Sequence, residues 1–93
     1  MVYVVERYLP GLDQRALESS LAQLRETTRG TPVTYLGSTI VPGDEACFCQ
    51  FEGPSEEAVA EANRRAGVPF DRIVAAVAVP ARSKPSRARR PTP

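Results

Sequence analysis

Two cysteines and a few acidic, amide and phenolic side chains are the residues of this sequence that could carry chemistry. Cys47 and Cys49 lie one residue apart in the segment ACFCQFE, so in a strand both sulfur atoms would point to the same face. A closed zinc site uses about four ligands, whereas this pair supplies two and the chain contains no histidine. A redox pair is more usually spaced C-x-x-C at the start of a helix. We therefore interpret both cysteines as reduced, buried core residues, and we assign no metal ligand and no cofactor.

Segments rich in β-branched and aromatic residues predict the strands that would position these side chains. The sequence Pro-Gly-Asp-Glu between the second and third segments is typical of a turn, which makes this pair of strands a hairpin. The four predicted strands span residues 2–9, 33–41, 46–52 and 72–79.

Two helices are predicted between these strands. Asp13 is a suitable N-cap for a helix that runs to about Thr28, in which leucines recur at i, i+4 and i+7 and form one apolar stripe. Ser55 caps the second helix, whose first turn carries two glutamates, as the helix dipole favours. Gly67 stands where that helix should stop.

The resulting order, β-α-β-β-α-β, predicts an α+β fold of the ferredoxin-like type. In this fold a four-stranded antiparallel sheet carries both helices on one face and leaves the other face uncovered. We assign one such domain to residues 1–80. The longest apolar run is too short to cross a membrane, and the chain opens without a secretory signal pattern, so we expect a cytoplasmic protein.

The remaining residues, 81–93, form a basic tail rich in proline, serine and arginine, which we expect to be disordered because it has no large apolar side chain to bury. Its five basic residues leave seven basic and eleven acidic residues in the rest of the chain. Nucleic acid could therefore be attracted only through the tail. A solvated extension, or one that rests on the acidic domain, explains the tail better, since no aromatic residue is interleaved for base stacking.

Period-two alternation sorts the strand residues into two faces. One set is predicted to form the core beneath the helices: Cys47, Cys49, Phe51, Ile73 and Val77. The other set forms a mixed, largely apolar outer face that resembles the lining of a pocket: Val4, Glu6, Tyr8, Phe48, Gln50, Glu52, Val74 and Ala76. We take the ligand-binding candidates to be Val4, Glu6, Tyr8, Tyr35, Phe48, Gln50 and Glu52.

The catalytic candidates among them are Glu6, Glu52 and Tyr8. A carboxylate on an apolar face has its pKa raised by desolvation and could act as a general base near neutral pH. A phenol, from Tyr8 or Tyr35, could donate a hydrogen bond to a developing oxyanion. Each of these side chains could instead be a solvated rim residue or make a hydrogen bond within a dimer. Nucleophile systems that need histidine are excluded by composition.

Three segments resemble a small nickel-binding, ferredoxin-like family of bacterial proteins: YVVERYLPGL, VPGDEACFCQFEGPSEEAVAEANRRAG and PFDRIV. The most specific part, FCQFEGPS at 48–55, is similar to the family's Phe-Cys-x-x-Glu-Ala-Pro-Ser. The resemblance spans roughly residues 2–79. It implies a homodimer in which two sheets face each other across a shared cavity, a dimeric α+β barrel.

The resemblance also implies nickel binding, but the metal-binding members look to carry histidines where Glu6 and Asn63 align in this sequence. Imidazole and thiolate suit nickel best, whereas carboxylates suit harder ions. We therefore favour a small-molecule-binding homodimer, with cofactor-free cyclisation, isomerisation or oxidation as candidate reactions. The alternative is a histidine-free metal site in which two copies of Glu6 and Glu52 approach one cavity. A structural or partner-binding module without a cavity is the third interpretation.

Overall fold

The computed structural model describes residues 1–81. Its elements follow the predicted order, with one short 3-10 helix added in the hairpin. They are β1 (Val2–Tyr8), α1 (Gln14–Thr28), β2 (Thr34–Val41), η1 (Pro42–Asp44), β3 (Ala46–Glu52), α2 (Glu56–Ala66) and β4 (Arg72–Ala76). The tail predicted at 81–93 lies outside the described residues except for Ala81, which is exposed.

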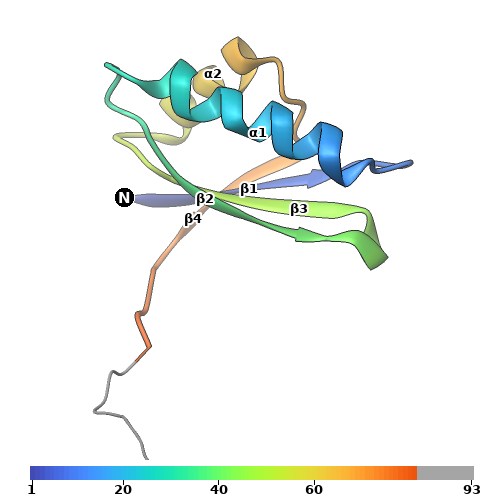
Figure 1. The fold of residues 1–93 in the computed structure, drawn as a ribbon. Helices are drawn as coiled ribbons and strands as arrows, with labels where there is room; N and C mark the ends of the chain where they lie inside the picture. Colours follow the sequence, from blue (N-terminus) through green and yellow to red (C-terminus); the bar gives the residue numbers. More distant parts are fainter. Residues whose placement is uncertain (82–93) are drawn as a thin grey trace, which may run out of the picture.

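The four strands form one antiparallel sheet in the order β2-β3-β1-β4. Both helices lie on one face of this sheet, and within residues 1–81 no element covers the opposite face (Figure 1). The predicted ferredoxin-like α+β fold is therefore confirmed. β1 and β3 are the two central strands, so the side chains that they present on either face have a paired strand on both sides.

The helix boundaries agree with the capping residues read from the sequence. The Asp13 carboxylate accepts a hydrogen bond from the Ala16 backbone N–H at 3.2 Å, and the Ser55 hydroxyl accepts one from the Ala58 N–H at 3.1 Å. Each bond satisfies a backbone donor that a first helical turn leaves without a partner. α2 ends at Ala66 and is capped by Gly67, whose φ of 72° lies in the left-handed region that glycine adopts without steric cost.

The core lies between the helices and the inner face of the sheet. Val5 of β1 and Phe51 of β3 are fully buried there, against Leu24 of α1 and Val59 of α2. The apolar stripes of the two helices and the inward residues of the strands thus form one contiguous cluster, as their spacing predicts.

The last strand is shorter than predicted, and this corrects the assignment of Val77 to the core. β4 ends at Ala76, which pairs with Val2 at the start of β1. Beyond that pair β1 offers no further residue in the sheet, so the chain leaves the body of the domain and Val77 is 86% exposed (Figure 1). Ile73, which pairs with Val5, packs against the core as predicted.

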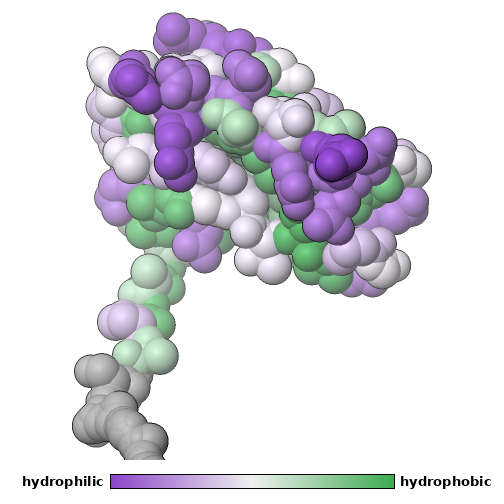
Figure 2. Space-filling view, in the orientation of Figure 1, coloured by the Kyte–Doolittle hydropathy of each residue, from purple (hydrophilic) through white to green (hydrophobic). Residues whose placement is uncertain are grey.

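Polar and apolar side chains are distributed unevenly over the surface. Figure 2 shows hydrophilic side chains gathered over the helical layer, as expected for the solvated faces of amphipathic helices. Several large apolar residues are exposed on the strands or on the segments next to them: Met1, Tyr8, Leu36, Val77 and Val79.

Candidate functional site

The outer face of the sheet brings most of the predicted site residues together. In the pairing of β1 with β3, Val4 lies opposite Gln50 and Glu6 lies opposite Phe48. In the pairing of β1 with β4, Val4 lies opposite Val74. The face is therefore largely apolar around Glu6, as the alternation of the strands predicts.

Glu6 is held by a residue that the sequence analysis did not select. Arg72, at the start of β4, lies opposite Glu6 in the sheet. Its Nε donates to Glu6 Oε1 at 3.2 Å and its Nη2 donates to Oε2 at 3.0 Å. This two-point contact, through the hydrogen bonds and the charge of Glu6, raises the pKa of Arg72. The position opposite an acidic residue on a neighbouring strand is the signal that could have identified Arg72.

The Glu6 side chain is only 15% exposed, whereas that of Arg72 is 64% exposed. The carboxylate is therefore largely shielded from solvent, with Phe48 opposite it on one side and its more exposed partner Arg72 on the other. Each oxygen atom of Glu6 accepts one hydrogen bond from Arg72. The arrangement suits the positioning of a bound polar group better than proton abstraction.

The second carboxylate candidate lies apart from the first. Glu52 is opposite Val2, at the end of β3 away from Phe48, and its carboxylate accepts from the amino group of Met1 at 2.7 Å. Its side chain is 52% exposed. Within one chain, Glu6 and Glu52 thus share a face without forming a carboxylate pair.

Tyr8 lies at the opposite end of this face from Glu52. Its ring meets that of Phe48 edge to face, with 6.5 Å between ring centroids and an interplanar angle of 86°. Tyr8 is 52% exposed, so its hydroxyl group is available to a ligand or to a second chain.

Tyr35 does not belong to this face. It lies opposite Phe51 in the sheet and packs on that ring, with 5.3 Å between centroids, so it faces the helices. An irregularity in β2 between Tyr35 and Gly37 shifts the register and leaves Leu36 exposed. Burial raises the pKa of Tyr35, and its hydroxyl group is hydrogen-bonded to Ser38.

The inner side of the sheet holds a buried polar network around Arg7, which the sequence analysis did not propose. Arg7 is fully buried, and its Nη1 donates to the carbonyl oxygens of Val68 and Pro69, at 3.4 and 3.1 Å. Its Nη2 donates to Asn63 Oδ1 at 2.6 Å and to Cys49 Sγ at 3.3 Å. No ion pair between described residues involves Arg7, and its Nε is buried without a partner.

Alternation along β1 was a sufficient signal that Arg7 faces the core, although it does not identify the partners of Arg7. Arg7 follows Tyr3 and Val5 at intervals of two residues, which places all three on the face beneath the helices. A charged residue in that register is rare enough to mark a polar network or a functional site.

Both cysteines are free, buried thiols, as predicted. Their sulfur atoms lie 3.7 Å apart, and the Ser38 hydroxyl donates to Cys49 Sγ at 2.9 Å. Burial first, and then the neighbouring Cys49, raise the pKa of Cys47 to about 11. Cys47 therefore stays protonated at neutral pH.

Several hollows open on the helical side of the protein, and the two larger ones adjoin residues named above. One, of about 560 Å³, is lined by residues of α1 and by Tyr35 and Ser38 of β2; we call it the α1–β2 groove. The other, of about 590 Å³, lies at the C-terminal end of α2 and includes Asn63 and Phe70. Between residues 1 and 81, no cluster of three or more cysteine, aspartate or glutamate side chains is arranged to hold a metal ion. In the same residues, no helix is long and apolar enough to span a membrane.

The sequence profile of the nickel-responsive, SCO4226-like protein family matches residues 3–75. The chain belongs to this family. A solved structure from the same family supports the fold: the crystal structure of SCO4226 from Streptomyces coelicolor A3(2) is similar with a TM-score of 0.74 and 23% sequence identity. The similarity covers 87% of this chain and 100% of SCO4226. No curated protein sequence matches the chain.

Membership of the SCO4226-like family agrees with the resemblance seen in the segment around Cys49 and Ser55. At this level of sequence identity, the similarity to SCO4226 describes the fold. The site residues of this chain must therefore be judged from their own geometry.

Proposed function

We propose that two copies of this chain associate through their outer sheet faces and enclose a binding site for a small molecule. The observation that carries this proposal is the environment of Glu6, a carboxylate enclosed on a sheet face that no element of residues 1–81 covers. A largely buried carboxylate is usually paired with a cation or takes part in binding, because burying an unpaired charge is costly.

In an isologous dimer, the second subunit would cover the outer face of the sheet. The same patch on both subunits is self-complementary in a two-fold arrangement, so each Phe48 and Val4 would find an apolar counterpart. Association would also remove water from the Glu6–Arg72 pair, which strengthens its electrostatic interactions with a ligand. A polar small molecule could then be oriented by Arg72 and Gln50 while its apolar part contacts Val4 and Phe48.

Native mass spectrometry of the protein purified without a metal-affinity step tests this proposal. A dimer that carries an organic adduct is the expected result, and its mass would give the mass of the ligand. Phe48→Glu should weaken dimerisation by about 100-fold, because it would bury an unpaired charge in each half of the interface. Ser19→Glu places the same charge on the exposed part of α1 and should leave the dimer intact. A wild-type protein that is monomeric at micromolar concentration would contradict the proposal.

A nickel-type cation is the second candidate ligand, and family membership is the observation that favours it. In a dimer, two copies of Glu6 and two of Glu52 would lie on the enclosed faces, and carboxylates can bind a divalent cation. Calorimetric titration of the metal-free protein with Ni²⁺ should then show binding that Glu6→Gln abolishes. Absence of heat above the dilution background, with a dimer present, would exclude this ligand and leave the small-molecule proposal standing.

A further inference from the structure

Two hydrogen-bond donors, Arg7 and Ser38, converge on the sulfur of Cys49, which also lies next to the sulfur of Cys47. Arg7 Nη2 lies at 3.3 Å, Ser38 Oγ at 2.9 Å and Cys47 Sγ at 3.7 Å. Arg7 and Cys47 are fully buried, so these contacts form in a place where electrostatic interactions are strong. A sulfur atom that only fills space in a core needs none of these donors.

The buried guanidinium of Arg7 has no carboxylate partner among the described residues. A buried guanidinium is normally matched by a carboxylate, because an unpaired buried charge is costly. Here the partners of Arg7 are two backbone carbonyls, the amide oxygen of Asn63 and the sulfur of Cys49. Among these, Cys49 is the one nucleophilic group, and Arg7 Nη2 is placed to hydrogen-bond its sulfur while that sulfur reacts.

The sulfur atom lies one side-chain layer below the surface. Ser38 is exposed, and with Tyr35 it lines the α1–β2 groove, about 560 Å³ in volume. The hydroxyl groups of Tyr35 and Ser38 are hydrogen-bonded to each other, and Ser38 contacts Cys49 Sγ. A hydrogen-bonded chain therefore leads from the groove to the sulfur, and rotation of Ser38 would open a path for a small molecule.

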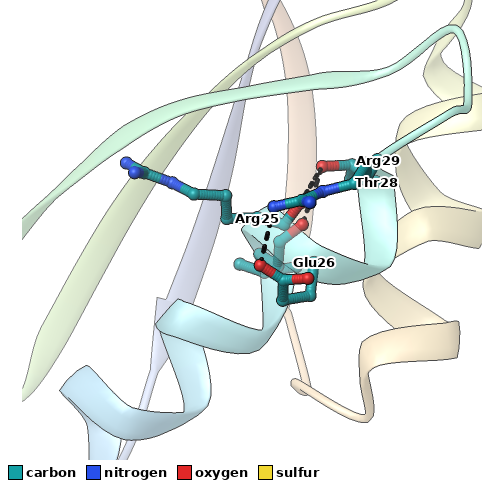
Figure 3. A network of polar contacts seen from close by, with 5 residues as sticks. Arg25, Glu26, Thr28 and Arg29 are labelled. Atoms are coloured by element: carbon teal, nitrogen blue, oxygen red, sulfur yellow. Dashed lines mark hydrogen bonds and ion pairs between the residues drawn. The ribbon is translucent and has the colours of Figure 1, made fainter.

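Charged side chains of α1 line this groove. Arg29 donates to Glu26 at 2.9 Å, whereas no ion pair between described residues includes Arg25. Figure 3 shows the Arg25 side chain extending away from that pair. Arg25 lines the α1–β2 groove together with the carboxylates of Glu18 and Glu26, so a small polar oxidant such as hydrogen peroxide meets hydrogen-bonding groups of both charges there.

We propose that Cys49 is a peroxide-reactive thiol, activated by Arg7 and reached through the α1–β2 groove. The sulfur of Cys49 attacks one oxygen of hydrogen peroxide; a sulfur–oxygen bond forms and the oxygen–oxygen bond breaks. The second oxygen leaves as water with the proton from the thiol, which the hydroxyl groups of Ser38 and Tyr35 are placed to transfer. Cys49 is oxidised by two electrons to a sulfenic acid and the peroxide is reduced. Two equivalents of a small thiol restore Cys49, with release of water and of that thiol's disulfide.

Single-thiol variants decide which cysteine reacts. Full-length Cys47→Ala and Cys49→Ala are treated with hydrogen peroxide at pH 7 in the presence of dimedone, a trap for sulfenic acid, and the adduct is followed by intact-mass spectrometry. The chain with Cys49 alone should form adduct about tenfold faster than the chain with Cys47 alone, because only Cys49 receives a hydrogen bond from a buried cation. Equal rates, or a faster reaction at Cys47, would overturn the proposal.

Two further variants in the Cys47→Ala background test the mechanism. Arg7→Met should slow adduct formation about tenfold, whereas Arg7→Lys should restore most of the rate because it keeps the charge. Ser38→Val, at an exposed position, should slow the reaction to a similar extent by removing the hydroxyl group and narrowing the path. Ser20→Val makes the same change on α1 outside the lining of the groove and should have no effect. Unchanged rates in Ser38→Val, with circular dichroism confirming a native fold, would contradict the inferred route whether or not the Arg7 variants fold.

Discussion

Arg7 Nη2 donates to Asn63 Oδ1 at 2.6 Å although both side chains are entirely buried. Asn63 also donates from its amide nitrogen to the Val59 carbonyl at 2.8 Å, so its orientation is fixed by α2 itself. The central strand β1 and helix α2 are thus joined by a polar contact inside an otherwise apolar core. Folding of the domain therefore buries the Arg7 guanidinium, and Asn63 supplies one of the acceptors that it needs there.

Replacing Asn63 should therefore lower the stability of the folded protein. Asn63→Leu removes an acceptor from a buried cation, and we expect the free energy of unfolding to fall by about 2 to 4 kcal/mol, measured by urea denaturation. The double variant Arg7→Met/Asn63→Leu should recover part of this loss, because it removes the charge together with its acceptor. Arg64→Ala, on the exposed side of the same helix, serves as the control and should change stability by less than about 0.5 kcal/mol. Strictly additive losses in the double variant would show that the two side chains do not depend on each other.

Alkaline pH should weaken the folded state through Cys47. The pKa of this thiol is raised from 9.0 to about 11 in the folded protein, chiefly by burial, so the folded state holds the proton more tightly than the unfolded state does. The stabilisation is complete below pH 9 and is lost as the pH rises from 9 to about 11, by about 2 to 3 kcal/mol. Cys47→Ala should reduce the slope of stability against pH in this interval, even though its stability at neutral pH is lower. Parallel slopes for the two proteins would assign the alkaline loss to other groups.

Ser55, the N-cap of α2, should contribute to the stability of the folded protein. Ser55→Ala removes the hydroxyl group that accepts from the Ala58 N–H, and it should lower the free energy of unfolding by about 1 kcal/mol. Ser55→Asp keeps an acceptor at the same place and should retain most of the stability, since a negative charge also suits the start of a helix. Thermal unfolding followed by circular dichroism can rank the three proteins. An Ala variant as stable as the wild type would mean that the cap is not used in solution.

The end of β4 can be tested by comparing Ile73 with Val77. Ile73→Ser removes a side chain that packs against the core and should lower the free energy of unfolding by more than 1 kcal/mol, roughly the value of a partly buried aliphatic group. Val77→Ser alters a residue that is 86% exposed and should change it by less than about 0.5 kcal/mol. Equal losses would mean that β4 extends past Ala76 in solution.

Local signals in the sequence were enough to predict the elements and the fold. Asp13, Ser55 and Gly67 cap the helices where the sequence places them, and alternation correctly puts Cys47, Cys49 and Phe51 inside. These features depend on neighbours within a few residues or on the period of a single strand, which is why the sequence contains them.

The parts that depend on pairing between distant strands were not predicted. Arg72 meets Glu6 only because β4 pairs with β1 in one register, and Val77 is exposed only because β1 begins at Val2. Tyr35 faces the helices in a strand whose register shifts immediately after it. The network of Arg7 with Asn63 and Cys49 likewise needs β1, β3 and α2 to meet, and composition alone does not contain that information.

The sheet order also sets the sequence of events when the chain is synthesised. β2 and β3 are neighbours in the chain and can pair as a local hairpin as soon as both have emerged from the ribosome. β1 is made first, yet one of its two edges must wait for β4, the last strand, since Val2 pairs with Ala76. The nascent domain therefore exposes one edge of its central strand until β4 has emerged from the ribosome, an interval in which chaperones or a second nascent chain could occupy that edge.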